Sequence, residues 1–260
     1  MAEHLYTSAL AKGQGMISET IFLLKLWEPG MDSSQLVNRA IETGVLQRAT
    51  AKRVKDIVKE VFKGRYLSDN ARPARQLKQI ISKKTSISWL PQLFLIYTAR
   101  ANAILHDFIC HVYWSKYASG TPFIKIQDSM TFLEEAILTG HIPNRWSETM
   151  MTRVSSYILG CLADFDLVGT NQHGKREIKP FIISKPTLLY LIHDIHFSGY
   201  SDNSILDHPD WCLFGLDKRN ILQGIERISF DGHFIMQNAG DFVRIAWKYK
   251  TMEECISVLT

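Results

Sequence analysis

The stretch "RATAKRVKDIVKEVFKGRYLSDNARPARQLKQIISKK", residues 48–84, carries twelve Lys or Arg residues against three acids, a local balance of +9. The whole chain has 260 residues and a net charge of only +4, so the remaining residues carry a balance of −5. A concentrated basic surface is the electrostatic footprint of a polyanion partner. A solvated helical face would have the same composition, so both interpretations stay open at this point.

Apolar residues within this stretch recur at helical spacing. Val54, Ile57, Val58, Val61 and Phe62 follow the i, i+3, i+4, i+7, i+8 pattern of an amphipathic helix. Thr50 is a plausible N-cap because its hydroxyl can accept a hydrogen bond from a free amide of the first turn. Gly64 is a plausible end. The pattern therefore predicts a helix whose first turn exposes basic and hydroxyl side chains.

A shorter helix is predicted just upstream in "SSQLVNRAIETG", capped by Asp32 or Ser33 and ended by Gly44. The order of helix, glycine-containing turn and basic helix is that of a helix-turn-helix, whose second helix enters the major groove with its first residues leading. Residues 71–82 form another predicted basic helix. The candidate DNA contacts in this half are Arg48, Thr50, Lys52, Arg53, Lys55, Lys59, Arg75 and Lys78.

The second half repeats this device. "AILTGHI" (136–142) echoes "AIETGVL" (40–46), and a helix over about 148–163, capped by Ser147, follows. Its outward face is small, hydroxylated and singly basic, which suits close approach to phosphates but would equally suit a helix–helix contact. The candidate contacts on this face are Thr149, Thr152, Arg153 and Ser156.

A hairpin is predicted after this helix, in "FDLVG–TNQHGKRE–IKPFIIS". A hairpin in this place is typical of a winged helix, and Lys175 and Arg176 at its tip would meet the DNA backbone. A plain solvated hairpin is the alternative. The hairpin adds Lys175 and Arg176 to the candidate contacts.

The remaining pattern predicts a mainly α, multi-helix globular fold with two helix-turn-helix-like units and short wing-like β-hairpins. Residues 16–27 form a predicted first helix, and residues 89–116 form a predicted long central helix. A boundary near residue 120 divides the chain into an N-terminal helical domain (1–120) and a C-terminal helical domain with the winged-helix-like unit (121–260). Further helices are predicted at "HPDWCLFGL" and 217–228, and strands at 233–237 and 242–249.

Composition favours a soluble cytoplasmic protein. The most apolar run, residues 87–99, is shorter than the roughly 20 residues that a membrane span needs, and the first residues show no secretory signal. The four cysteines lie far apart in the sequence, which is ordinary for a reducing compartment.

No motif predicts an enzyme, a cofactor or a metal. Phosphate-binding loops, dinucleotide fingerprints and nucleophile elbows are absent. The groups around His106–His111 and His193–His196 do not have zinc spacing. Asp164 or Asp166 with Glu177 and Lys179 imitates the Asp…Glu-x-Lys set of metal-dependent nucleases, which keeps a nuclease as a minor alternative.

Five stretches resemble the BrxA family of bacterial BREX phage-defence systems: "GVLQRATAKRVKDIVKEVF", "FICHVYW", "ADFDLVG", "HPDWCLFGL" and "VRIAW". The resemblance extends from about residue 15 to residue 258. It implies a mostly helical, non-enzymatic protein that binds double-stranded DNA and works beside a DNA methyltransferase, an ATPase and an alkaline-phosphatase-like protein. It carries no catalytic residue onto this chain.

The leading hypothesis is therefore a DNA-binding component of a BREX system that contacts mainly the phosphate backbone. The alternatives are a protein–protein adaptor, whose basic stretch meets an acidic partner, and the nuclease. The net charge of +4 is modest for a DNA-binding protein, so we expect weak, salt-sensitive binding.

Overall fold

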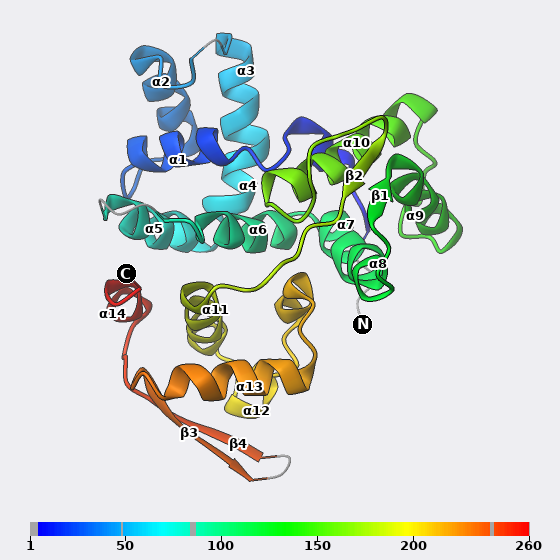
Figure 1. Ribbon diagram of the computed structural model, residues 1–260. Coiled ribbons are helices and arrows are strands. Elements are labelled where there is room, and N and C mark those ends of the chain that lie inside the picture. Colours follow the sequence, from blue (N-terminus) through cyan, green and yellow to red (C-terminus); the bar gives the residue numbers. More distant parts are fainter. Residues whose placement is uncertain (1–4, 48, 84–86, 240–241, 260) are drawn as a thin grey trace.

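The computed structural model describes residues 5–47, 49–83, 87–239 and 242–259. It is a mainly helical protein with two small antiparallel β-sheets. In Figure 1, α5 (Ser68–Ser82) and α6 (Leu90–Arg100) run across the middle of the molecule. The first helices lie above this layer, the C-terminal elements lie below it, and the remaining elements lie at one end.

The N-terminal elements are built as the apolar stripe predicts. They are η1 (Ser8–Lys12), α1 (Ile17–Leu26), α2 (Ser33–Thr43), α3 (Ala51–Asp56), the π-helical η2 (Ile57–Phe62) and α4 (Lys63–Tyr66). All five stripe residues from Val54 to Phe62 are buried. Asp32 caps α2 by accepting from the amides of Ser34 and Gln35. The predicted helix over this stretch is therefore confirmed.

Gly64 does not end this helix, contrary to the prediction. The helix continues to Tyr66 because the next two residues are anchored in the interior. The buried guanidinium of Arg65 donates to the carbonyls of Gly13 and Gly15, at 2.8 and 3.3 Å, and Tyr66 is fully buried. This packing outweighs the preference of glycine for a helix end.

The predicted long helix over 89–116 is also wrong, because it is broken and bent. The segment consists of α6, α7 (Ala103–Asp107), the π-helical η3 (Phe108–Tyr113) and α8 (Trp114–Ala118), with a bend of 117° between α6 and the rest. Asn102, at the break, has non-helical backbone angles, and its side-chain amide donates to the carbonyl of Thr98 at 2.8 Å. An asparagine that bonds its own backbone competes with the helical ladder in this way.

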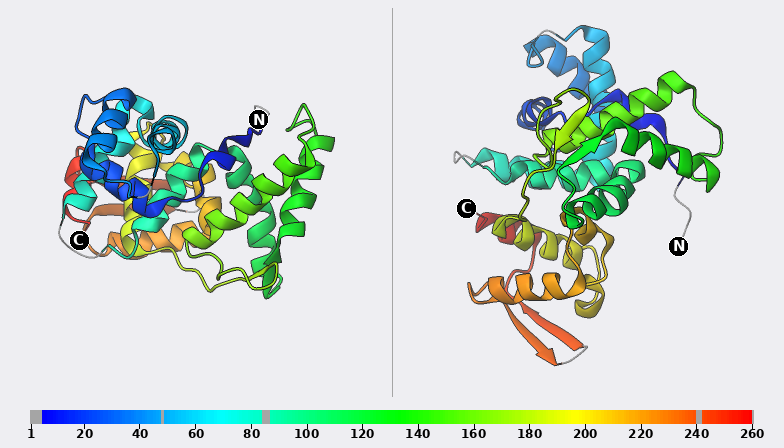
Figure 2. Two further views of the ribbon diagram at one scale, coloured as in Figure 1. Left: turned by 90° about the horizontal axis from the view of Figure 1, so that it is seen from above. Right: turned by 45° about the vertical axis from the view of Figure 1, so that its right-hand side comes forward.

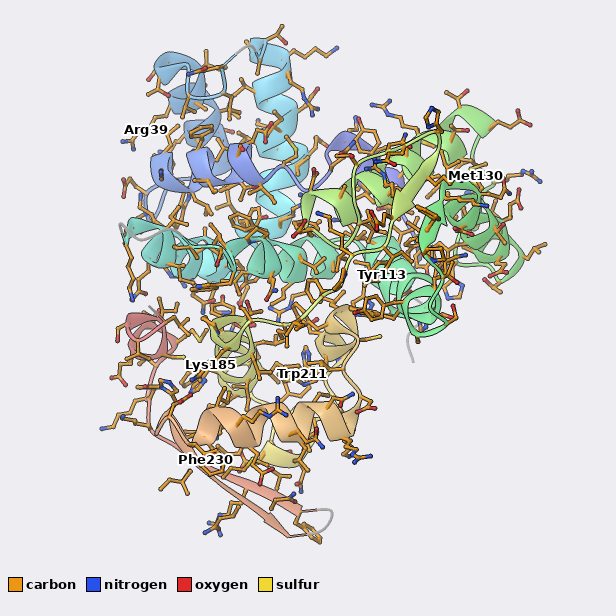
Figure 3. All side chains as sticks on the ribbon, viewed as in Figure 1. Arg39, Tyr113, Met130, Lys185, Trp211 and Phe230 are labelled. Atoms are coloured by element: carbon orange, nitrogen blue, oxygen red, sulfur yellow. The ribbon has the colours of Figure 1, made fainter. Side chains whose placement is uncertain are left out.

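A second group of elements follows: β1 (Phe123–Lys125), α9 (Ile126–Leu138), α10 (Glu148–Asp164) and β2 (Lys175–Glu177). β1 pairs antiparallel with β2, with Ile124 opposite Arg176, and an isolated bridge joins Val168 to Ile178. The Sδ atom of Met130 on α9 accepts a hydrogen bond from the Ser155 hydroxyl on α10, and the Tyr113 hydroxyl donates to the carbonyl of Leu167 (Figure 3). These contacts hold α9, α10 and the hairpin as one group.

The C-terminal elements also include two helices joined at a glycine turn and followed by a hairpin. They are α11 (Lys185–Phe197), α12 (Asp202–Ile205), η4 (Pro209–Phe214), α13 (Lys218–Ser229), β3 (Phe234–Ala239), β4 (Phe242–Trp247) and α14 (Met252–Ser257). Gly215, with φ +64°, turns the chain between η4 and α13, and the β3–β4 hairpin follows. Figures 1 and 2 show this hairpin extending away from the rest of the molecule. The sequence predicted η4, α13 and the two strands, but not α12 or the arrangement of these elements.

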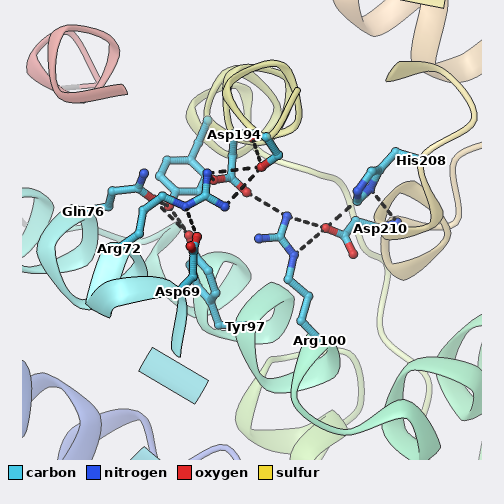
Figure 4. Close-up of polar contacts among 10 residues, drawn as sticks. Asp69, Arg72, Gln76, Tyr97, Arg100, Asp194, His208 and Asp210 are labelled. Carbon is cyan, nitrogen blue, oxygen red and sulfur yellow. Dashed lines mark hydrogen bonds and ion pairs between the residues drawn. The ribbon is translucent and has the colours of Figure 1, made fainter. Parts of the chain in front are cut away.

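A buried ionic cluster joins the middle layer to the C-terminal elements (Figure 4). Arg100 on α6 contacts Asp194 on α11 at 2.7 Å and Asp210 on η4 at 2.6 Å, and both carboxylates are buried. Burial alone would lower the pKa of Arg100, but the two carboxylates raise it above its ordinary value. Arg72 on α5 reaches Asp194 at 3.9 Å. The C-terminal elements are thus fixed to the layer by charge as well as by apolar packing.

Candidate nucleic-acid interface

The first candidate surface is the N-terminal turn of α3. The hydroxyl of Thr50 caps the helix by accepting from the amide of Arg53 at 3.2 Å, as predicted. Lys52, Arg53 and Lys55 are exposed, and Lys59 is half-buried. Arg53 also donates to the carbonyl of Lys12 at 3.0 Å, so one face of its guanidinium is held by η1. Arg48 lies outside the described residues.

The rest of the basic stretch has internal roles. Lys78 donates to the carbonyl of Lys25 at 3.2 Å and to Glu28 at 3.0 Å, at the end of α1. Arg75 is exposed and donates to the carbonyl of Asn70. Lys83 donates to the carbonyls of Ile256 and Ser257. The basic stretch therefore keeps cations outward on α3, and also at Lys63 and Arg75, while Lys78 and Lys83 turn toward backbone acceptors.

The second candidate surface is the outer face of α10. Ser147 caps the helix by accepting from the amide of Met150 at 3.3 Å. The structure brings the predicted side chains together on one exposed face: Thr149, Thr152, Arg153 and Ser156. Arg153 lies over the ring of Tyr157 with its guanidinium carbon 5.8 Å from the centroid. Gly160, farther along, is buried against Gln14, so the last part of this face makes an internal contact instead.

The same helix–Thr–Gly turn precedes both surfaces. α2 ends at Thr43 and α9 is followed by Thr139, and the hydroxyl of each threonine donates to the carbonyl four residues earlier. A glycine with positive φ follows each threonine, at +60° for Gly44 and +84° for Gly140. The aliphatic residue two positions later is buried in both. The echo noticed in the sequence is therefore a repeat of structure.

The hairpin after α10 differs in detail from the prediction. Lys175 and Arg176 belong to strand β2 rather than to the loop tip, and the predicted second strand over 178–184 is mostly unpaired extended chain. Lys175 is exposed, with its ammonium 5.3 Å from the ring centroid of Phe123, while Arg176 donates to the carbonyl of Gly169 at 3.3 Å. Lys175 bridges to Gln172, so it directly follows the two-residue turn of the hairpin, and β2 also pairs with β1. Sequence periodicity missed this because β1 is only three residues long.

The N-terminal segment ties the two surfaces together, which the sequence did not reveal. η1 packs against both η2 and α10. The amide of Gly15 donates to the carboxylate of Asp164 at the end of α10, at 2.9 Å, and burial raises the pKa of Asp164. The glycines at positions 13 and 15 are the only sequence signal of this close approach, because a Cβ at either would lie within 2.6 Å of a neighbouring side chain.

The residues of the nuclease alternative are engaged in other contacts. Asp164 accepts from Gly15, and Lys179 pairs with Asp166. In the part of the chain that the structure describes, no three His, Cys, Asp or Glu side chains form a group that could hold a metal ion.

The sequence profile of the BrxA family matches residues 4–194, which include both candidate surfaces. The chain belongs to the BrxA family. Members of this family are components of BREX phage-defence systems. The profile ends within α11, so the last two resembling stretches, "HPDWCLFGL" and "VRIAW", lie beyond the matched residues.

The comparison with solved structures gives a similar fold. A crystal structure of an uncharacterized protein from Magnetospirillum magneticum superimposes with a TM-score of 0.58 and 16% sequence identity. The match covers 74% of this chain and 94% of that chain, and at this identity it shows the fold alone. No curated protein matches the chain.

Among the described residues of this BrxA-family chain, no single helix is long and apolar enough to cross a membrane. Only α6 taken together with the segment Ala103–Ala118, which is bent relative to it, has the length and apolar composition of a membrane span.

Proposed function

We propose that this BrxA-family protein binds duplex DNA through two helix-turn-helix units, α2–α3 and α9–α10, the second with a wing formed by residues 168–178. The observation that carries the proposal is the repeated helix–Thr–Gly turn, which presents a capped second helix with an exposed polar face each time. A second helix presented in this way is the element that helix-turn-helix proteins place in the major groove.

The side chains on these faces suit phosphates better than base edges. Lys52, Arg53 and Lys55 supply positive charge at the start of α3, and the hydroxyls of α10 supply short donors around Arg153. Contacts of this kind position a protein on DNA without reading its sequence. We therefore expect low sequence preference. Strong preference for one site in competition binding contradicts this part of the proposal.

The test is binding to a short duplex across a salt series. Each neutralised phosphate contributes about −0.9 to the slope of log K against log salt. The double variant Lys52→Ala, Arg53→Ala should bind more weakly, and its slope should be shallower by the contribution of about two phosphates. Lys218→Ala, Arg219→Ala is the matched control, since it removes the same residue types from the start of α13.

Absence of binding by the wild type at low salt overturns the proposal, and so does an equal loss of slope in the control. We propose no enzymatic step. A nuclease would cut DNA with Mg²⁺ or Mn²⁺ and lose that activity in Glu177→Ala, so metal-dependent cleavage abolished by this substitution contradicts the non-enzymatic reading.

A second candidate function is a protein–protein adaptor within the defence complex. It is favoured by the exposed cations at the start of α3, Lys52, Arg53 and Lys55, which would suit the acidic surface of a protein as well as phosphates. The partners are then the other BREX components: the methyltransferase, the ATPase or the alkaline-phosphatase-like protein. In that case charge reversal at Lys52 and Arg53 disrupts assembly of the complex while the wild type shows no DNA binding.

A further inference from the structure

A cavity of about 490 Å³ lies between α13 and the segment that leads from the wing to α11. Figure 3 places Lys185, one of its lining residues, between the middle layer and α13. Small-molecule sites have volumes of roughly 300–1,000 Å³. The cavity shares no residue with the two proposed DNA-binding surfaces. Its lining residues are Phe181, Ile182, Ile183, Lys185, Leu188, Phe214, Leu216, Asn220, Gln223, Gly224, Arg227 and Ile228.

Most of the lining is apolar. The rings of Phe181 and Phe214 stack with their centroids 6.1 Å apart and an interplanar angle of 23°. Leu188 on α11 and Ile228 on α13 are buried. Ile182 lines the same cavity and yet leaves 84% of its surface exposed, so the apolar wall continues out to solvent. A ligand with an apolar body would cover this exposed surface.

The walls of the cavity are fixed by contacts with neighbouring elements. Gln92 on α6 brackets the connecting segment, because its Nε2 donates to the carbonyl of Ile182 at 3.0 Å and its Oε1 accepts from the amide of Ser184 at 2.9 Å. On the other side, a Cβ at Gly224 would lie 2.9 Å from Cδ2 of Leu188, so α13 lies close to α11. A site that is already formed costs little ordering entropy when a ligand binds.

The polar part of the lining is cationic. Among the described residues that line the cavity, Lys185 and Arg227 are cations and none is an acid. Lys185 is paired with Asp231 at 2.5 Å, whereas the exposed Arg227 has no carboxylate partner within the described part of the chain. Asn220 and Gln223 lie on the same face of α13 at helical spacing from Arg227 and add amide donors. The cavity therefore offers one uncompensated positive charge.

We propose that this cavity binds a small apolar monocarboxylate, with its carboxylate on Arg227 and its apolar body against Phe181 and Phe214. A guanidinium matches the geometry of a carboxylate and binds it through two parallel hydrogen bonds. A single free cation balances one negative charge, whereas a phosphate monoester would bring between one and a half and two. This binding site is additional to the proposed DNA binding and does not depend on it.

The experiment is a titration of the full chain, carrying labelled isoleucine methyl groups, with decanoate and with 2-naphthoate, followed by NMR. We expect saturable shifts at the methyl groups of Ile182, Ile183 and Ile228, while those of Ile104 and Ile256, which are buried elsewhere, stay in place. Binding of either acid supports the proposal, and the tighter one shows whether the preferred body is a chain or a ring. Uncharged decanol and cationic decyltrimethylammonium should bind at least about tenfold more weakly than decanoate, because they lose the charge-assisted hydrogen bonds.

One pair of variants tests the role of the guanidinium. Arg227→Gln removes the charge and keeps an amide, so it should weaken binding of the preferred acid by about tenfold or more and leave decanol unaffected. Arg219→Gln is the matched control, because Arg219 is exposed on the same helix but does not line the cavity. The proposal is overturned if neither acid gives saturable shifts at millimolar concentration. Equal affinities for decanoate and decanol, or equal losses in the two variants, also overturn it. No DNA is present, so failure of the proposed DNA binding would not change these results.

Discussion

Asp194 is a fully buried carboxylate whose charge is balanced by cations from another part of the chain. Arg100 contacts it at 2.7 Å and Arg72 at 3.9 Å, both from the middle layer (Figure 4). Arg100 also neutralises Asp210. Removing one partner of a buried ion pair is costly mainly because the other charge is left buried and uncompensated.

Arg100→Ala leaves the carboxylates of Asp194 and Asp210 buried without this partner, so it should lower the free energy of unfolding by about 3–5 kcal/mol, measured by urea denaturation. Lys218→Ala is the matched control, since it removes the partner of Asp207 in an exposed pair at 3.3 Å and should cost less than about 1 kcal/mol. Equal effects of the two substitutions would show that the buried cluster does not stabilise the junction.

His193 is a second buried group with a measurable consequence. Its Nδ1 contacts the carbonyl of Leu189 at 2.8 Å, and aromatic rings of Phe234, Trp247 and Tyr249 surround the imidazole. Burial, together with the charges of His196 and His233, lowers the pKa of His193 to about 4, against an ordinary value of 6.5. The folded protein thus holds this imidazole neutral.

Between about pH 6.5 and pH 4 the unfolded chain binds a proton at this residue and the folded chain does not. Stability should therefore fall as the pH falls through this window, by up to about 3 kcal/mol from His193 alone. Thermal unfolding from pH 7 to pH 4.5 measures the effect, and His193→Phe should flatten the profile. The lowered pKa values of His196 and His208 act in the same direction, so part of the slope should persist.

At the scale of the element, the repeated helix–Thr–Gly turn depends on a backbone conformation that favours glycine. Gly44 and Gly140 have φ of +60° and +84°, with open space where a Cβ would be. Gly44→Ala and Gly140→Ala should each destabilise the protein by about 1 kcal/mol through backbone strain alone.

Gly64 offers the matched control for these two substitutions. It also has open space at its Cβ, but it lies inside a helix without positive φ. Gly64→Ala should therefore stabilise the protein by roughly 0.5–1 kcal/mol, because alanine has the higher helix propensity. Chemical denaturation of the three variants gives the signs, and a stabilising effect at Gly44 or Gly140 would contradict the argument.

Structural features with a local cause could be predicted from the sequence, and those that depend on distant partners could not. Local signals such as the apolar stripe from Val54 to Phe62 and the caps Thr50 and Ser147 predicted their helices correctly, because the cause lies within a few residues. Gly64 and Asn102 misled the prediction because their roles depend on distant partners or on one side-chain bond. The same limit applies to the candidate contacts: the exposed face of α10 was predictable from helical periodicity, whereas the contacts of Lys78 with the end of α1 were not.

At the scale of the whole molecule, the two candidate DNA-binding helices belong to one framework. η1 packs against η2 and α10, Arg53 and Arg65 bond to the carbonyls of Lys12 and Gly13, and Gly15 bonds to Asp164. These contacts connect the start of α3 to the end of α10 through a few residues. A rigid connection of this kind favours simultaneous binding of both units to one duplex, because little freedom remains to be lost when the second unit binds.

This framework predicts how the two surfaces combine. Lys52→Ala, Arg53→Ala removes two cations and Arg153→Ala removes one. On a long duplex, the slope of log K against log salt for the triple variant should therefore be shallower by the contribution of about three phosphates. On a duplex too short to reach both units, the effects should not add, because only one surface can be occupied. Binding to the long duplex should also be tighter by roughly 10²- to 10⁴-fold, the gain expected when a second contact becomes intramolecular. Equal affinity for both lengths, together with two duplexes bound per protein, would mean that each unit takes its own DNA molecule. The framework would then place two duplexes at a fixed separation.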